Sequence, residues 1–316
     1  WLLHATHRHR RRLRVVYDLH GEEAPDEREL AHLAGYAGAR PVRVGNGAKR
    51  QLQLDIFGEV VDTAYQFVAR GGTLDGAQGR LLAAVGEAVC RLWRQPDQGL
   101  WEQRTGARHH TFSKAMCWVA LDRLVKLAER GLVRVPLAGF RRQRDAIRAA
   151  VEDRGWSERL GSYVDELDGE ELDATLLLLG VYGFEEAGSP RMRATLARVQ
   201  ERLGAGDTGL LYRYPPGRDG LPPHEGAFGV CGFWAVELLA RAGETAAAEE
   251  RLARLVGYAN DVGLFAEEID PATGAPLGNF PQAFTHLGLI NAAQVLAESL
   301  GQAAAPARPR RAEARL

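Results

Sequence analysis

Two short segments, far apart in the chain, carry carboxyl groups in surroundings that favour acid–base chemistry. Glu102 lies in the run Gly-Leu-Trp-Glu-Gln-Arg, directly after Trp101. Glu267 and Glu268 follow a similar lead-in, Gly-Leu-Phe-Ala. A carboxyl beside a large ring is shielded from water, and this shielding favours its protonated form. Each segment alone also fits an ordinary polar loop, but two such acids on matching loops favour a shared site.

Two carboxyls that face one cleft are the minimum needed to break a glycosidic bond. One carboxyl donates a proton to the departing oxygen, and the other withdraws a proton from an attacking water molecule. A pair that activates water in this way lies roughly 6.5–9.5 Å apart. The chemistry therefore depends on elements that bring residues 102 and 267 to the same place.

The elements around these loops are predicted to be helices of two alternating kinds. Charged, amphipathic patterns with one wet face alternate with patterns that are apolar nearly all round. Outer helices are predicted at residues 74–95, 139–154, 191–203 and 244–261, and inner helices at 57–70, 111–130, 171–184, 225–241 and 281–300. With a basic opening helix from Trp1, about ten helices are expected. This order predicts an all-α ring of inner helices wrapped by outer ones. A stacked helical solenoid is the alternative, but its connections would be more uniform in length.

The connections that run from an outer to an inner helix are long and rich in glycine, aromatic and charged residues. They cover residues 35–56, 94–110, 155–170, 204–224 and 261–280. In an α/α barrel all five would open at one end, and long irregular loops are usually functional. Glu102 and Glu267 lie in two of these loops. The sequence therefore predicts a pocket at one mouth of the ring.

Composition excludes several other classes of function. The 316 residues carry a net charge of −1, so no basic surface for nucleic acid is indicated. The sequence contains no apolar run of about 18 residues, so no membrane span is predicted. Three widely spaced cysteines, Cys90, Cys117 and Cys231, favour a reducing compartment such as the cytoplasm. The histidine pairs lack metal-site spacing and Gly45-Asn46-Gly47 lacks a phosphate-loop pattern, so neither a metal nor a cofactor is expected.

Three segments resemble glycoside hydrolase family 15, which includes glucoamylases, glucodextranases and a trehalase branch. Residues 97–123, DQGLWEQRTGARHHTFSKAMCWVALDR, resemble its general-acid segment. Residues 39–62, ARPVRVGNGAKRQLQLDIFGEVVD, and 263–293, GLFAEEIDPATGAPLGNFPQAFTHLGLINAA, resemble a substrate loop and the base segment of the trehalase branch. The resemblance runs from about residue 1 to 300 and implies an (α/α)6 barrel of twelve helices, in agreement with the alternation.

The resemblance also implies roles for individual residues. Glu102 matches the general acid and Glu267 the general base, with Glu268 as the alternative base. The implied reaction inverts the anomeric carbon of a small α-glucoside. Residues matching sugar-binding positions are Arg213, which would clamp hydroxyls, and Asn46, Gln53 and Asp55, which would cover the first glucose. On chemical grounds Arg104 and Lys114 would add donors and Trp101 and Phe265 flat faces, although Arg104, Lys114 and Asp55 also fit ordinary structural positions.

The chain departs from the family pattern at its front. It begins at Trp1, without the family's N-terminal β-sandwich and Trp-Leu-Arg-Asp element. Residues 1–300 are therefore expected to form a barrel that lacks its first helices, and residues 301–316 a flexible tail. Such a ring would expose apolar inner surface and show weak activity or none.

Trehalose is the substrate favoured by the resemblance. The alternatives are exo-hydrolysis of α-1,4- or α-1,6-glucans, and an inactive helical scaffold or sugar-binding protein. We expect no nucleic-acid or membrane partner.

Overall fold

Several helices begin where the sequence supplies a cap for the free backbone amides. The computed structural model describes residues 13–22, 24–215 and 225–301. Asp75 precedes α3 (Gly76–Leu92) and forms a reciprocal capping box with Gln78. Ser189 caps α7 (Pro190–Leu203), whose first residue is proline, which is suited to that position. Local sequence therefore fixes where these two helices start.

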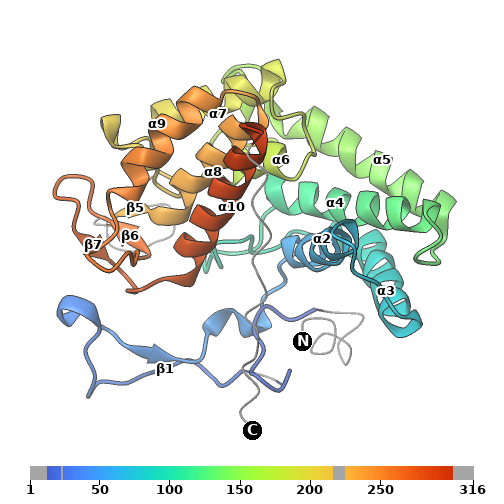
Figure 1. Cartoon of the computed structure of the whole chain (residues 1–316). Helices are drawn as coiled ribbons and strands as arrows, with labels where there is room; N and C mark the ends of the chain where they lie inside the picture. The colour runs from blue at the N-terminus through green and yellow to red at the C-terminus, as the bar shows by residue number, and fades with distance from the viewer. Residues whose placement is uncertain (1–12, 23, 216–224, 302–316) are drawn as a thin grey trace, which may run out of the picture.

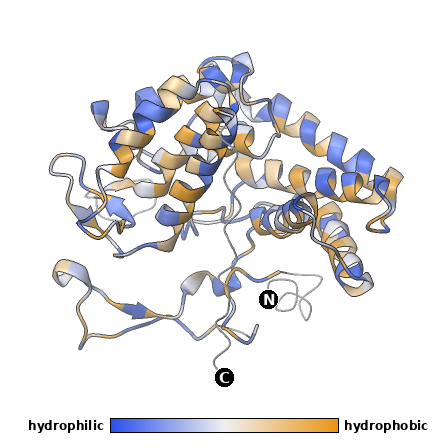
Figure 2. Ribbon diagram, in the orientation of Figure 1, coloured by the Kyte–Doolittle hydropathy of each residue, from blue (hydrophilic) through white to orange (hydrophobic). Residues whose placement is uncertain are grey.

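The helices form two layers (Figure 1). The outer layer comprises α3, α5 (Leu137–Arg154), α7 and α9 (Thr245–Val256). The inner layer comprises α2 (Asp55–Ala69), α4 (Thr111–Glu129), α6 (Leu178–Val181), α8 (Gly229–Arg241) and α10 (Ala283–Ser299). Figure 2 shows the inner helices as mostly hydrophobic ribbons and α5 as mostly hydrophilic. The predicted all-α alternation of inner and outer helices is confirmed.

Neighbouring inner helices pack along the ring. The α2–α4 and α8–α10 pairs make the most extensive contacts, and the short α6 joins the two pairs. Helix α4 is buried on nearly every side, and α5 covers it from outside. Among the described residues no extensive packing joins α10 to α2, so the ring is open between them.

Small strands and single 3-10 turns occupy the connections. The pairs are β1 (Arg28–Glu29) with β2 (Arg43–Val44), β3 (Trp156–Ser157) with β4 (Ser162–Tyr163), and β5 (Ala227–Phe228) with β6 (Glu268–Ile269) and β7 (Pro276–Leu277), all antiparallel. The 3-10 turns are η1 (Tyr36–Gly38), η2 (Gly47–Arg50), η3 (Ala174–Leu177) and η4 (Gly206–Thr208). The β5–β6–β7 sheet matters most here, because it connects the start of α8 to the segment that carries Glu267.

Two predicted helices are shorter than expected. The expected helix at 171–184 is only η3 followed by α6. The side chain of Asp173 accepts the amide of Thr175 and caps the start of η3, and Gly183, with a φ of 70°, turns the chain after α6. The expected helix at 225–241 starts at Gly229, because Ala227–Phe228 pairs with β6. In both cases long-range or cap contacts override the local apolar pattern.

The ends of the chain were also predicted. Residues 1–12 of the expected opening helix lie outside the described residues, and 13–17 are not helical. All but Gly301 of the expected tail also lies outside them. No helix in the described ranges has the length and apolar character needed to cross a membrane.

Candidate active site

Ring contacts and sheet pairing bring the two glutamate segments to one rim of the barrel. The indole of Trp101 lies 5.3 Å, centroid to centroid, from the ring of Phe228. Phe228 pairs with Glu268 between β5 and β6, and the amide of Gly229 donates to the carbonyl of Glu267 at 2.8 Å. A single aromatic contact, between Trp101 and Phe228, therefore links the residue before Glu102 to the β5–β6 pair, whose second strand directly follows Glu267. The structure thus brings the two segments next to each other.

Glu102 is held in a backbone conformation that residues with a side chain rarely adopt. Its φ is 57°, in the left-handed region. Asn46 Nδ2 donates to both carboxyl oxygens, at 3.3 and 3.1 Å, and Gln51 Nε2 donates to its carbonyl at 3.1 Å. Strained backbone of this kind persists only where its surroundings hold it, and it is frequent at active sites.

Trp101 is enclosed from several sides. Its Nε1 donates to Asp173 Oδ2 at 2.7 Å. The rings of Tyr214, Phe228 and Trp234 surround the indole, with centroids 5.3–6.3 Å away. The guanidinium of Arg213 lies 5.4 Å from the indole centroid, within range of a cation–π contact. The orientation of the ring beside Glu102 is therefore fixed.

A buried polar cluster lies beneath this loop. Burial, with a smaller contribution from the nearby Asp165, raises the pKa of Asp173 to about 6, while the bond from Trp101 opposes the change. Asp165 lies 3.3 Å from His110 Nδ1. Burial lowers the pKa of His110, but Asp165 outweighs burial and the net shift is upward. The cluster thus ties the start of α4 to the segment that leads into η3.

Glu267 is surrounded by hydrogen-bond donors from its own loop. The backbone amide and Nδ2 of Asn279 both donate to Oε2 at 2.9 Å, and Gln282 Nε2 donates to Oε1 at 3.3 Å. These donors stabilise an ionised carboxylate. Gly278 beside it has a φ of 68°, and a Cβ there would lie 2.7 Å from Glu267 Oε2, so only glycine fits.

Glu268 occupies a different environment. As the first residue of β6 it projects from the opposite face of the strand to Glu267. Its Oε2 accepts a hydrogen bond from the amide of Gly226 at 3.0 Å. The donor set around Glu267 therefore favours Glu267 as the base.

Two of the predicted cations are at the rim. Arg213 pairs with Glu225 and lies over the rings of Tyr214 and Phe228 as well as Trp101. Arg104 is largely exposed and pairs with Glu27 at 2.8 Å.

Several predicted sugar-contacting residues are inside the protein instead. Lys114 is 1% exposed, and its Nζ donates to the Gln95 carbonyl at 2.5 Å and lies 3.8 Å from Asp97. Burial lowers the pKa of Lys114. Because α4 starts beneath the loop rather than beside the mouth, this ammonium anchors the loop from below. The prediction that Lys114 contacts sugar is contradicted by its burial.

The predictions that Asp55, Gln53 and Phe265 cover or face the sugar are corrected for the same reason. Asp55 is 1% exposed at the start of α2, and burial together with Asp97 and Glu59 raises its pKa to about 8. Gln53 and Phe265 are each 3% exposed. Gln53 reaches the site indirectly, by donating to Gln51 at 3.1 Å. Phe265 packs in the core against Phe233 and His286 instead of offering a face to a sugar.

The sequence analysis missed Gln51 and Asp173. Gln51 contacts Glu102 directly, whereas the residue predicted from the sequence was Gln53, two positions later. Asp173 lies at the edge of an apolar run that was interpreted as a buried helix. An acid at that position was the signal that its carboxylate has a partner.

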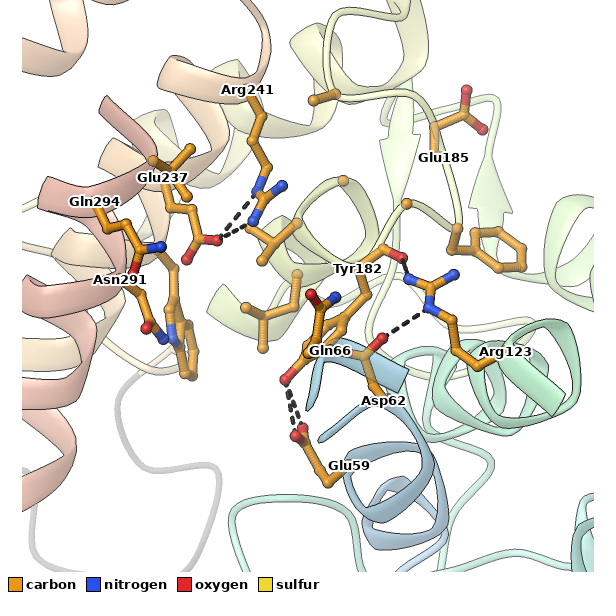
Figure 3. Close-up of a pocket in the computed structure, with 18 of the residues that line it drawn as sticks. Glu59, Asp62, Gln66, Arg123, Tyr182, Glu185, Glu237, Arg241, Asn291 and Gln294 are labelled. Carbon is orange, nitrogen blue, oxygen red and sulfur yellow. Dashed lines mark hydrogen bonds and ion pairs between the residues drawn. The ribbon is translucent and has the colours of Figure 1, made fainter. Parts of the chain in front are cut away.

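A large cavity among the described residues lies elsewhere. It has a volume of about 1290 Å³ and is lined mainly by the C-terminal parts of α2, α8 and α10 and by the turn after α6 (Figure 3). Glu59, Asp62, Arg123, Tyr182 and Glu237 face it (Figure 3). Neither Glu102 nor Glu267 lines it, because the loops that carry them join the N-terminal ends of the inner helices. We call this cavity the α2–α10 groove.

No cluster of three or more potential metal ligands is present in the described part of the chain. The histidines of the sequence run His7 and His9 lie outside it.

Comparison with known proteins gives matches over most of the chain. The trehalase of Mycobacterium tuberculosis is 41% identical over 288 residues, which are 91% of this chain and 42% of that protein. The trehalase of Thermoplasma volcanium is 34% identical over 289 residues, which are 92% of this chain and 46% of that protein. The chain therefore spans less than half the length of these relatives.

Solved structures with low sequence identity share the fold. A structure titled "Glycosidase Wild Type" has a TM-score of 0.68 at 21% identity, covering 87% of this chain and 75% of that one. A bacterial glucoamylase complexed with acarbose has a TM-score of 0.63 at 15% identity, covering 79% and 41%. These likenesses support the predicted (α/α)6 barrel architecture.

The family description "Glycosyl hydrolases family 15" matches residues 1–257 and 243–294. Its match covers the Glu102 and Glu267 segments, the helices between them and most of α10. The chain belongs to glycosyl hydrolases family 15.

Proposed function

We propose that the protein is an inverting glycoside hydrolase that cleaves terminal α-glucosidic bonds, with trehalose as its preferred substrate. The observation that supports the proposal is the contact of Trp101, the residue before Glu102, with Phe228, which pairs with the strand that follows Glu267. Family membership supports the same chemistry. A scaffold that had lost catalysis would not need the donors that surround both carboxyls.

Each glutamate has an environment suited to one role. Glu102 is the proton donor to the leaving oxygen, and Asn46 holds its carboxyl in place. Glu267 is the base that takes a proton from the attacking water, because Asn279 and Gln282 stabilise its charge. Attack by water on the face opposite the departing group inverts the anomeric carbon. Arg213 supplies donors to sugar hydroxyls at the same rim.

The substrate proposal rests on the relatives that are trehalases. Hydrolysis of α-1,4- or α-1,6-glucans is the second candidate, favoured by the fold shared with a glucoamylase. We further propose that residues 1–300 form one catalytic domain, which is supported by continuous helix packing from α2 to α10. A cytoplasmic location is supported by the three unpaired cysteines.

The substitution Glu102→Gln tests the mechanism. Glutamine keeps the shape of the side chain and one acceptor oxygen for Asn46 but cannot donate the catalytic proton, so kcat should fall by about a hundredfold or more. The assay measures glucose released from trehalose, maltose and isomaltose, with the anomer of the first product followed by NMR. The matched control is Glu201→Gln on the outer helix α7, which pairs only with a surface arginine and should leave kcat unchanged. Retention of configuration, or full activity of Glu102→Gln, would contradict the proposal.

A further inference from the structure

Asp173 joins two parts of the molecule that are 72 residues apart in sequence. It is 1% exposed. Its Oδ1 accepts a hydrogen bond from the amide of Thr175 at 2.7 Å, which caps the start of η3. Its Oδ2 accepts the indole N–H of Trp101 at 2.7 Å. The two oxygens of one carboxylate therefore bind an inner-layer segment on one side and the acid-bearing loop on the other.

The acid-bearing loop needs such anchors because its backbone is strained next to Trp101. Glu102 adopts a φ of 57°, a conformation that other contacts must maintain. Asn46 holds the carboxyl of Glu102 and Gln51 holds its carbonyl. Both contacts come from the loop at 46–51 and act on one side of Glu102. Within the described residues, the hydrogen bond from Trp101 to Asp173 anchors the residue before Glu102 to the barrel itself.

A carboxylate is suited to this task. A hydrogen bond to an ionised acceptor is stronger and shorter than one between neutral groups, and the 2.7 Å separation fits that class. The position is also dry, because the rings of Tyr214, Phe228 and Trp234 pack around the indole. A contact in such surroundings resists exchange with water. We propose that Asp173 is a positioning residue of the hydrolytic site, which fixes Trp101 and through it the direction of Glu102.

This inference rests on the proposed function, and it predicts a particular kinetic signature. Asp173 does not touch the substrate, so Asp173→Asn should leave KM within about threefold of the wild-type value. It should lower kcat by about tenfold to a hundredfold, the typical effect of displacing a catalytic group by about 1 Å. A merely structural role would lower the amount of folded enzyme and its melting temperature without this separation of kcat from KM.

The experiment is a double-mutant cycle on the hydrolysis of trehalose. The variants are Asp173→Asn, Trp101→Phe, which removes the N–H but keeps an aromatic ring, and the double variant. If Asp173 acts through the indole, the double variant should be no slower than Trp101→Phe alone, within about twofold. The matched control is Asp168→Asn, the same chemical change five residues earlier, at a surface carboxylate that pairs with Arg154. Its kcat should be unchanged.

Fluorescence provides a second reading that does not need turnover. The difference in emission between the wild type and Trp101→Phe reports on Trp101, and Asp173→Asn should shift that component while Asp168→Asn should not. An unaffected kcat in Asp173→Asn, or effects that multiply in the double variant, would overturn the positioning role. A wild type that hydrolyses no α-glucoside would overturn the proposed function itself, so the two failures are distinguishable.

Discussion

At the scale of single residues, Asn46 has two separable jobs. Its Oδ1 accepts the amide of Ala48 at 2.8 Å and caps η2, while its Nδ2 donates to both oxygens of Glu102. Asn46→Ala removes both contacts, and Asn46→Ser keeps an oxygen for the cap but loses the amide group that reaches Glu102. We expect both variants to lower kcat about tenfold or more, because Glu102 loses its orientation.

Only the alanine variant should also lose stability, by about 1 kcal/mol, because it alone lacks the cap. Steady-state kinetics and urea denaturation of the two variants separate these effects. A serine variant with wild-type kcat would show that the contact to Glu102 is not needed.

The sequence predicted the site residues whose evidence is local. Glu102 and Glu267 were identified because each follows a glycine-leucine-aromatic lead-in. Lys114 was misjudged because a lysine at a helix start is usually exposed, and here α4 begins under the loop. Asp173 was missed since its partner lies 72 residues away. Depth and distant pairing depend on the fold, and no local pattern records them.

At the scale of elements, helix type was predictable and helix length was less so. Apolar or charged patterns correctly separated inner from outer helices, because each pattern reflects how many sides of the helix are buried. The start of α8 and the extent of α6 depended on strand pairing and on capping by Asp173, which involve other segments.

The close crossing of α2 and α4 gives a prediction at this scale. A Cβ on Gly58 would lie 2.5 Å from the carbonyl oxygen of Met116, a backbone atom that moves only with the helix. Gly58→Ala should therefore destabilise the protein by about 1–3 kcal/mol, as overpacking does. Gly139→Ala in α5 is the matched control, since the nearest atom to its Cβ is a flexible arginine nitrogen 4.0 Å away. It should stabilise by about 0.4–1 kcal/mol. Equal effects in urea denaturation would contradict the crossing.

At the scale of the whole molecule, the ring is open on one side and that opening has a mixed surface. Among the described residues, Phe284, Leu287 and Ile290 of α10 are 63%, 52% and 57% exposed and form an apolar ridge on this helix. Next to these side chains the α2–α10 groove is polar, with acids and arginines in mutual contact (Figure 3). The open side therefore combines an apolar ridge with a charged hollow, at the other end of the inner helices from the proposed catalytic rim.

Charge in the groove links the stability of the molecule to pH through Glu59. Its carboxyl oxygens accept the hydroxyl of Tyr182 at 2.9 Å, and burial raises its pKa from the ordinary 4.5 to about 7, with a smaller contribution from Asp62. A raised pKa in the folded state means that the stabilising contribution is complete below about pH 4.5 and is lost as the pH rises through 7. Tyr182 faces Glu59 from the turn after α6, and Asp62 lies about one turn further along α2 itself.

Glu59→Gln removes this ionisation while keeping an acceptor for Tyr182. Relative to the wild type, the variant should gain roughly 2–3 kcal/mol of unfolding free energy as the pH is raised from 5 to 8.5, because folding raises the pKa of Glu59 from 4.5 to about 7 and each pKa unit corresponds to about 1.36 kcal/mol. The measurement is urea denaturation of both proteins across that range. Glu298→Gln is the control, because Glu298 lines the same groove on α10 but is exposed to solvent, and its difference from the wild type should not vary with pH. A difference for Glu59→Gln that is constant with pH would mean that Glu59 keeps its charge in the folded protein, so the groove would be wetter than its lining indicates.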